Sequence, residues 1–582
     1  MRRDEGKKSV SRFALWGGMR VAVVLLIGIL GAALGQNVGP VAAGPDAEDG
    51  IDVIVRYRET NRGQLARAGQ QRKTRGGLAL QSVHGLAMRV TRAELARLSR
   101  DPSVEGISPD RPVYAAAAAA PGLDYAYESV LGGAGTQFGL TGRGIGVAII
   151  DSGVFDHSDL SGSVNGNKII VYEESFVGGD AKDAYGHGTH VAGLLAGNGD
   201  SSKGSSNTHS FRGLAPDVQI VNLKALGANG AGTDSSVIRA IDRAIQLKAA
   251  YNIRVINLSI GRPVYQSFRV DPLCLAVERA WKSGIVVVVS AGNEGRNNSH
   301  GNGGYGTIMA PGNSPYVITV GAMRTGYTAS RADDGLASYS SKGPTSIDHI
   351  AKPDLVAPGN RLIALLAANT SISNSTSVNR VPYSLFETSS SGLTPHYYRL
   401  SGTSMAAPLV AGTAALMIQK EPGLTPDQVK ARLMRTASKY LPLQTTAQDP
   451  ETGQSFVLQQ DLFALGAGYL DVASALTDTA LLAGPALSPR VVFNPVTGSA
   501  TLAFDTSVAW GDSVAWGDSV AWGTSVLWGS NVNGTAVAWG SSVAWGTQTS
   551  TALTVLWGDS SAWAASTATA SASFNLLVQG DK

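Results

Sequence analysis

Cysteine is almost absent from this sequence of 582 residues, because Cys274 is the only one. One cysteine cannot form an intramolecular disulfide, so no cross-link stabilises the fold. Cys274 lies in the amphipathic helical pattern DPLCLAVERAWKSG, and we interpret it as a small buried side chain, not as a reactive thiol. Charged residues are also sparse, at 16% against 43% hydrophobic residues. This composition indicates globular domains and excludes a chain that is disordered throughout.

Long apolar runs are missing except near the N-terminus. There a basic stretch over residues 2–20 precedes the apolar run from Val21 to Leu34, and the small residues Ala33 and Gly35 fit a signal-peptidase site. The run of about 14 residues is short for a bilayer span. We therefore predict an export signal over 1–35, with an uncleaved anchor as the alternative, followed by a linker over 36–50. A signal of this kind predicts a secreted protein.

A basic surface for nucleic acid is missing as well. Residues 1–114 carry 18 Lys and Arg against 11 Asp and Glu, which leaves 29 against 33 in the rest of the chain. The basic residues are thus concentrated at the front, and no basic segment interleaved with aromatic residues follows. This distribution excludes nucleic acid as a partner.

Two regions of different pattern follow the linker. Residues 51–120, called the front unit below, combine the alternating strand pattern IDVIVRYRE with the helical pattern TRAELARLSRD and end in an alanine run. They predict a small α+β unit. Over 121–477, the main domain, apolar runs such as GVAIID and GIVVVVSAGN alternate with helical patterns such as SSVIRAIDRAIQLKAA. This alternation predicts an α/β domain with a doubly wound, mostly parallel sheet that is covered on both faces.

The region 478–582 is rich in tryptophan and glycine. Within its SVAWGD-like hexads, Val and Trp lie two residues apart and so face one side of a strand, while Gly-Asp or Gly-Ser suits a two-residue turn. The repeats predict a β-meander or a β-solenoid; a low-complexity tail that becomes ordered on contact with a surface or partner is the alternative. Eight of the ten tryptophans lie here: Trp510, Trp516, Trp522, Trp528, Trp539, Trp545, Trp557 and Trp563.

Four polar residues stand where predicted strands or helices begin or end. Ser404 in GTSMAAP lies at the N-terminus of a helix expected over Met405–Gln419 with Pro408 in its first turn, and a helix N-terminus favours developing negative charge. Asp151 ends the strand GVAIID, at the edge where open α/β sheets bind ligands. His187 begins a helix, and Asn293 follows an apolar strand. Each one alone is an ordinary loop or capping residue, but together they offer a nucleophile, a base, an orienting carboxylate and an oxyanion donor.

The motifs VAIIDSG, HGTHVAG, AGNEG and GTSMAAP, in that order, closely resemble the subtilisin-like serine peptidases (subtilases) over roughly 122–477. The resemblance implies that Asp151 is the orienting acid, His187 the general base and acid, and Ser404 the nucleophile that forms an acyl-enzyme. It also implies that Asn293 is the oxyanion donor. His190 matches a family histidine that packs structurally, and the pair HxxH lacks the third ligand of a zinc site. A serine endopeptidase acting on proteins or peptides follows, with no cofactor required for the chemistry.

The resemblance extends to substrate binding. LGANGAG and LSIG look like the two segments between which subtilases clamp an extended peptide, and the residues of SAG look like a wall of the first specificity pocket. A Ser/Asn/Thr-rich stretch over about 368–398 departs from the family pattern, and we interpret it as a surface insertion that narrows access. The substrate-binding residues implied are Gly230, Ala231, Gly232, Ser259, Ile260, Gly261, Ser290, Ala291 and Gly292.

The front unit resembles the inhibitory propeptide of the same family, which assists folding and is then removed. This likeness implies a self-processing zymogen whose own propeptide is one of its partners. Family members often bind structural calcium. Here no DxDxDG loop is present, and only the polar loop 198–213 offers carbonyl ligands, so no metal-binding residue is assigned.

Two other functions compete with this hypothesis. A non-enzymatic adhesion or binding protein built on an inactive peptidase scaffold would need none of the four polar residues. A processing protease of the proprotein-convertase kind would need an acidic cluster near its specificity pockets, where only Asp234 and Glu294 stand. The sequence therefore favours broad or apolar specificity. We expect the tryptophan repeats to contact a cell surface or a polymer.

Overall fold

The computed structural model describes most of the chain between Gly50 and Asn494. The predicted signal, the linker before Gly50, the run 116–120 and most of the tryptophan repeats lie outside the described residues. The chain divides into two units, 1–49 and 50–582, and every described residue belongs to the second. Among the described residues, no helix is both long enough and apolar enough to cross a bilayer. The described residues are 50–58, 77–115, 138–161, 163–164, 167–299, 302–326, 330–375, 379–439, 441–450, 452–481, 484–494, 499–503, 515–516, 520–521, 526–527 and 581.

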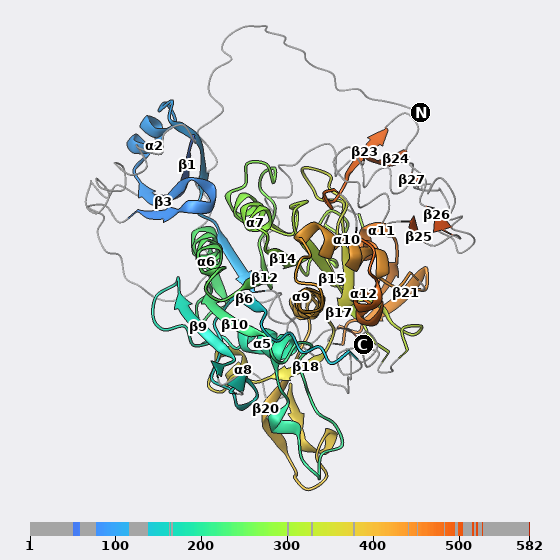
Figure 1. The fold of residues 1–582 in the computed structure, drawn as a ribbon. Coiled ribbons are helices and arrows are strands. Elements are labelled where there is room, and N and C mark those ends of the chain that lie inside the picture. The colour runs from blue at the N-terminus through green and yellow to red at the C-terminus, as the bar shows by residue number, and fades with distance from the viewer. Residues whose placement is uncertain are drawn as a thin grey trace, which may run out of the picture. The chain divides into compact units, whose positions relative to one another are not determined.

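A mostly parallel sheet forms the middle of the fold (Figure 1). Its order is β16-β15-β14-β12-β6-β10-β9, with β17 beside β15, and of its described strands only β16 pairs antiparallel. The run VVVVS is buried along its whole length, as a strand covered on both faces must be. The predicted α/β, doubly wound sheet is confirmed. Its strands are β6 (Gly146–Asp151), β9 (Ile170–Ser175), β10 (Gln219–Lys224), β12 (Ile253–Leu258), β14 (Val286–Ser290), β15 (Ile318–Arg324), β16 (Gly335–Leu336) and β17 (Leu355–Pro358).

Helices pack against this sheet in two groups. Helices α5 and α9 contact each other, and α9 lies against β12, β14, β15 and β17; helices α6 and α7 contact each other and pack on β12 and β14 respectively. The sequence shows why α6 and α7 begin where they do, because the side chains of Thr233 and Asp271 cap their first N–H groups. The helices are α5 (His187–Ala196), α6 (Asp234–Leu247), α7 (Pro272–Lys282), α9 (Thr403–Lys420), α10 (Pro426–Thr436), α11 (Leu462–Leu465) and α12 (Val472–Thr477).

One local prediction about α9 is wrong. Pro408 does not lie in the first turn, because the helix begins at Thr403 and the proline falls in the second turn. A proline there removes the N–H that would bond to the carbonyl oxygen of Ser404 four residues earlier. The Ser259 hydroxyl donates to that oxygen instead, at 2.8 Å. The proline is tolerated because a side chain from another segment replaces the missing donor.

The front unit forms its own antiparallel sheet, in the order β2-β3-β1-β4, with one helix beside it. It is joined to the start and the outer side of α6. The Asp242 carboxylate accepts hydrogen bonds from the backbone N–H groups of Gln81 and Ser82, at 2.6 Å each, and Asp110 accepts from Ser235. The elements are β1 (Ile51–Tyr57), β2 (Leu78–Leu80), β3 (Gly85–Val90), α2 (Arg92–Leu98), β4 (Val104–Pro109) and β5 (Pro112–Ala115).

The stretch predicted to be a surface insertion contributes to a second, antiparallel sheet of β18 (Leu362–Leu365), β20 (Leu393–Leu400) and β19 (Arg380–Pro382), which projects at the bottom of Figure 1. The short helix α8 (Ser371–Ser375) precedes β19. Contrary to a purely surface role, Phe386 and Tyr397 are buried and stack their rings with Phe211. The polar composition of the stretch concealed these few aromatic residues, which anchor it to the main domain.

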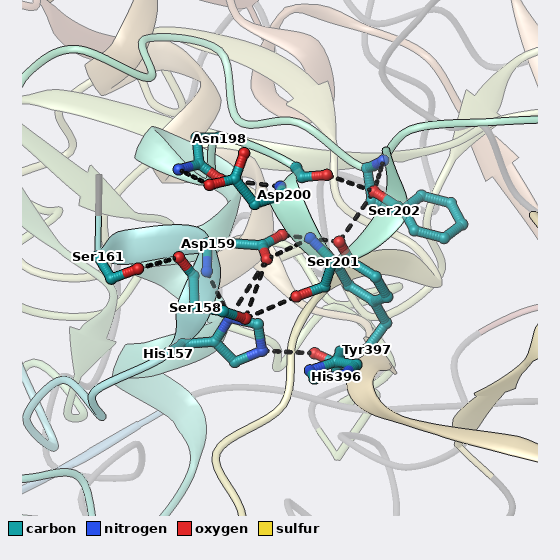
Figure 2. A network of polar contacts seen from close by, with 12 residues as sticks. His157, Ser158, Asp159, Ser161, Asn198, Asp200, Ser201, Ser202, His396 and Tyr397 are labelled. Atoms are coloured by element: carbon teal, nitrogen blue, oxygen red, sulfur yellow. Dashed lines mark hydrogen bonds and ion pairs between the residues drawn. The ribbon is translucent and has the colours of Figure 1, made fainter. Parts of the chain in front are cut away.

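A polar network joins this sheet to two short 3-10 turns, 158–160 and 200–202 (Figure 2). The Tyr397 hydroxyl donates to Asp159 Oδ2 at 2.7 Å and lies 2.8 Å from the Ser202 hydroxyl oxygen. The backbone N–H of Ser201 donates to the other carboxylate oxygen of Asp159 at 2.9 Å. His157 Nε2 lies 3.1 Å from the carbonyl oxygen of His396. Burial lowers the pKa of His157. The network therefore holds the loop 198–213 onto β20.

Only a small part of the tryptophan region is described. The strands β23 (Arg490–Asn494), β24 (Ser499–Ala503) and β27 (Val526–Leu527) pair antiparallel, and β25 (Ala515–Trp516) pairs with β26 (Val520–Ala521). These short antiparallel pairs are of the kind that the hexads predict. The remaining repeats lie outside the described residues, so the meander, the solenoid and the low-complexity tail all stay predictions. Two other hairpins, β7 with β8 (Ser163–Val164, Asn167–Lys168) and β21 with β22 (Gln444–Gln448, Ser455–Gln459), complete the fold.

Replacing Tyr397 with Phe should destabilise the protein. The change removes the hydroxyl group but keeps the ring, and it leaves a buried oxygen of Asp159 without that donor. We expect the free energy of unfolding to fall by about 1–3 kcal/mol in urea titrations followed by tryptophan fluorescence. Tyr265→Phe is the matched control, since that side chain is 39% exposed. Equal stability of the two variants would contradict the role given to the network.

Candidate active site

Asp151 and His187 form a hydrogen-bonded pair at one edge of the sheet. Strand β6 ends at Asp151 and helix α5 begins at His187. The distance between His187 Nδ1 and Asp151 Oδ1 is 2.7 Å, and both side chains are fully buried. Because the carboxylate can only accept, Nδ1 carries the hydrogen and the other ring nitrogen, Nε2, is the atom that can take a proton. This is the orientation that a general base requires.

Two glycines flank His187, and both are needed. A Cβ atom on Gly188 would lie 2.2 Å from the carbonyl oxygen of Gly153 and 3.1 Å from Cβ of Asp151. Gly186 has a φ of 107°, a left-handed conformation that favours glycine. Their small size therefore lets the start of α5 approach the end of β6 closely.

Asp183 is a buried carboxylate that the sequence analysis did not single out. It accepts hydrogen bonds from the backbone N–H and the hydroxyl group of Thr189, from the N–H of Gly186 and from the hydroxyl of Ser152. The Ser152 hydroxyl in turn accepts from the N–H of Gly188 at 2.9 Å. Burial raises the pKa of Asp183. The only signal in the sequence is an acidic residue just before a helix start, which is typical of a cap.

Ser404 and Asn293 form the second part of the site. Ser404 is the second residue of α9, and its hydroxyl donates to the carbonyl oxygen of Ser259 at 3.0 Å. The backbone N–H and the hydroxyl of Thr403 both donate to Asn293 Oδ1, at 3.0 Å each. These two bonds fix the amide group with its NH2 end as the available donor. Helix α5, which begins at His187, packs against helix α9, which carries Ser404 near its start.

His190 is fully buried and lies away from the carboxylates. Its Nε2 atom lies 3.1 Å from the carbonyl oxygen of Leu362 and 3.2 Å from that of Tyr398. Burial lowers the pKa of His190 to about 3, so the ring is neutral. These contacts agree with the structural role that the resemblance implies.

The two segments expected to clamp a peptide hold a strand of the front unit. Strand β5 lies between β11 (Ala231–Thr233) and β13 (Ile260–Gly261) and is antiparallel to both. Gly232 lies opposite Val113, Tyr114 lies opposite both Ala231 and Gly261, and Ile260 lies opposite Ala115. The Val113 side chain is fully buried, whereas Tyr114 is 45% exposed. The segments therefore bind an extended chain through its backbone and bury one of its side chains.

Met309 lies between Gly292, in the expected wall of the first specificity pocket, and Gly261 of the LSIG segment. A Cβ atom on Gly292 would lie 2.7 Å from Cγ of Met309, and one on Gly261 would lie 3.1 Å from Cβ of Met309. The backbone N–H of Met309 also donates to the carbonyl oxygen of Ala291 at 3.0 Å, next to Ser290 at the end of β14. The methionine side chain therefore occupies the space between Gly261 and Gly292. No motif in the sequence marks this residue.

Asp234, one of the two acidic residues near these segments, is already paired with a buried arginine. Asp234 accepts from Arg262 Nε at 2.7 Å, and Arg262 also pairs with Asp271 at 2.8 Å; all three side chains are fully buried. Burial raises the pKa of Asp234 to about 6 and also raises the pKa of Glu294. This arrangement supports the expectation that the pockets do not select basic residues.

The Asp200 carboxylate in the loop 198–213 is paired and offers no free ligand to a calcium ion. Calcium needs several free oxygen ligands, but the Asp200 carboxylate faces Lys203 Nζ at 2.7 Å and Asn198 Nδ2 at 2.9 Å. The nearby Asp159 already accepts from Tyr397 and Ser201 (Figure 2). Throughout the described ranges, no three His, Cys, Asp or Glu side chains gather as a metal-binding group.

Comparison with known proteins gives the relatives of this chain. Serine protease AprX of Bacillus subtilis (strain 168) is 39% identical over 310 residues, which are 52% of this chain and 63% of AprX. Subtilisin DY of Bacillus licheniformis is 34% identical over 303 residues, 52% of this chain and 86% of its own length. Extracellular serine proteinase of Thermus sp. (strain Rt41A) is 31% identical over 364 residues, 61% of this chain and 72% of its own length.

Among solved structures, fervidolysin from Fervidobacterium pennivorans, a keratinolytic enzyme related to subtilisin, has a TM-score of 0.51 to this chain. At 20% identity, with 76% of this chain and 63% of fervidolysin covered, the match shows the fold alone. The Subtilase family matches residues 142–464, which is more than half of the chain. The chain therefore belongs to the subtilase family of subtilisin-like serine peptidases, whose members are serine-type endopeptidases that need no cofactor for catalysis.

Proposed function

We propose that this chain is a secreted serine endopeptidase that hydrolyses peptide bonds through Asp151, His187 and Ser404 and is made as a self-processing zymogen. The observation that carries the proposal is the buried hydrogen bond of 2.7 Å between Asp151 and His187. Secretion rests on the signal-like pattern over 1–35, and the Thermus relative is called extracellular. The tryptophan repeats would then hold the enzyme on a cell surface or a polymer.

The mechanism follows from the donors and acceptors of the site. The Ser404 hydroxyl turns from the Ser259 carbonyl, gives its proton to His187 Nε2 and attacks the peptide carbonyl carbon. The negative charge on the carbonyl oxygen is stabilised by the Asn293 amide and the N–H of Ser404. Asp151 stabilises the imidazolium, which then protonates the leaving amine as the C–N bond breaks. Water, deprotonated by His187, hydrolyses the acyl-enzyme, and Ser404 regains its proton.

Strand β5 supports the zymogen proposal. It lies between the peptide-binding segments, and its last residue, Ala115, lies opposite Ile260. The neighbour of Ile260 is Ser259, whose carbonyl oxygen accepts the Ser404 hydroxyl. Strand β5 thus ends beside the segment that contacts the proposed nucleophile. We infer that the front unit is cut off within the alanine run 115–120.

Met309 supports a preference for small residues before the cut. Its side chain takes up room between Gly261 and Gly292, so a large substrate side chain would have to displace it. The alanine run is the inferred self-cleavage site, and its side chains are small. We infer that alanine or a similarly small residue precedes the bond that is cut.

Replacing Ser404 with Ala should leave the front unit attached. Intact mass spectrometry of the exported protein should show loss of the chain up to the alanine run in the wild type only, because the alanine variant lacks the nucleophile. Ser401→Ala is the matched control, since its hydroxyl accepts from the N–H of Arg361 and takes no part in the proposed chemistry. Normal processing of the Ser404 variant would mean that another protease makes the cut and that this proposal is wrong.

Replacing Met309 with Gly should widen the specificity of the enzyme. With peptides that differ only in Ala or Phe before the cut, kcat/KM for the Phe peptide should rise by about 10-fold or more relative to the Ala peptide, because the pocket gains several methylenes of space. Met309→Leu keeps the side-chain volume and should keep the wild-type ratio. An unchanged ratio in the glycine variant would show that another residue limits the pocket.

A further inference from the structure

Asp581 is the next-to-last residue of the chain and is fully buried. Its carboxylate oxygen Oδ1 accepts from Arg296 Nη2 at 2.7 Å and from the Ser338 hydroxyl at 2.6 Å. The other oxygen, Oδ2, accepts from the backbone N–H of Ser338 at 2.5 Å. Both oxygens are therefore bound by protein donors, one of them a cation. Such charge-assisted bonds are stronger than bonds between neutral groups.

Asn360 binds the main chain of the same residue. The backbone N–H of Asp581 donates to Asn360 Oδ1 at 2.9 Å, and Asn360 Nδ2 donates to the carbonyl oxygen of Asp581 at 3.2 Å. One side-chain amide thus binds both the backbone N–H and the backbone carbonyl oxygen of Asp581. A free ion or a lone carboxylate would bind to Arg296 and Ser338 but would leave the two Asn360 groups unused. The contacts therefore suit an aspartyl residue within a peptide chain.

The pocket is held in place by contacts that do not involve Asp581. Arg296 Nε donates to the Ser338 hydroxyl at 2.6 Å, and its guanidinium group pairs with Asp449 and lies 5.0 Å from the ring centre of Phe456. Ser338 and Asn360 are almost completely buried. Because neighbouring groups fix Arg296, little conformational entropy is lost when an aspartate binds.

The pocket lies beside the catalytic loops. Asn360 follows Gly359, whose carbonyl oxygen accepts from the N–H of Gly402 at 2.7 Å, two residues before Ser404. Arg296 follows the oxyanion donor Asn293 by three residues. The pocket therefore adjoins both the loop that carries the nucleophile and the loop that carries the oxyanion donor.

Strand β5 occupies a different part of this edge. The partners of β5 follow β10 and β12 in the chain, whereas Arg296, Ser338 and Asn360 follow β14, β16 and β17, which lie further along the sheet. A substrate that enters along β5 toward Ser404 continues past it in that direction. The pocket thus lies on the side of the C-terminal product, which is released first with a new amino group.

We propose that Arg296, Ser338 and Asn360 form a binding site for an aspartyl residue of a peptide chain on the leaving-group side of the active site, and that Asp581 of the same chain fills it. The term leaving-group side rests on the proposed function, but the binding site itself does not.

The first test uses the full chain with Ser404→Ala, so that no self-cleavage occurs. The probe is a fluorescent nonapeptide of residues 574–582, FNLLVQGDK, and its binding is measured by anisotropy. Asp581→Arg places a cation against Arg296 and should free the site, so this variant should bind the probe about 10-fold or more tightly than the parent chain. Asp559→Arg, in a second Gly-Asp pair of the same region, is the matched control and should bind like the parent.

A change in the probe tests the contacts without altering the protein. With the Asp581→Arg chain, a nonapeptide that carries Asn in place of the Asp should bind about 10–100-fold more weakly, because it loses a charge-assisted bond to Arg296. Equal binding of the two peptides, or no binding of either one, would overturn the proposal. Since the Ser404→Ala chain is inactive by design, these outcomes are independent of whether the protein is a peptidase.

A kinetic test locates the site relative to the reaction. On the self-processed Asp581→Arg enzyme, the free nonapeptide should inhibit cleavage of peptides that extend several residues beyond the cut. It should inhibit cleavage of a short peptide anilide about 10-fold less, because the anilide does not reach the pocket. Equal inhibition of both substrates would place the peptide in the cleft of β5 and contradict the proposal.

Discussion

The hydrogen bond between Asp151 and His187 is the contact on which the site depends. Both groups are fully buried, where such a bond is strong and a carboxylate without donors would be costly. It forms because β6 and α5 meet at one edge of the sheet and because Gly188 lets them approach. Asp183 adds a second buried carboxylate that ties the first turn of α5 to the residue after Asp151. The position of His187 is thus set by two acidic residues that belong to different segments.

The sequence could predict the parts of the fold and the site that are written in short local patterns. The apolar strands, the helix starts at His187 and near Ser404, and the polar residues at strand ends all follow from spacing and composition over a few residues. The start of α9 was misplaced by two residues, which put Pro408 in the wrong turn. Local patterns do not report that a distant serine supplies the missing donor.

The residues that the sequence could not reveal act through contacts between distant segments. Met309 matters because it meets Gly261 and Gly292, and Asp581 matters because it meets Arg296, which is 285 residues away in the chain. Neither residue stands in a motif. The buried aromatic residues near β20 were hidden for a related reason, since a polar stretch gives no sign that two of its members reach the core. Only the three-dimensional arrangement gives such residues a function.

The pairing of β5 has a consequence for the timing of activity. Among the residues that the structure describes, every ladder contact that holds β5 against β11 and β13 involves residues at or before Ala115. A cut in the alanine run therefore breaks a covalent bond without loosening the strand, and Asp242 continues to hold the backbone of Gln81 and Ser82. The severed front unit would stay in place as a tightly held product. Enzyme activity would then begin only when the front unit unfolds or is degraded, so the stability of that unit would set the delay before activity appears.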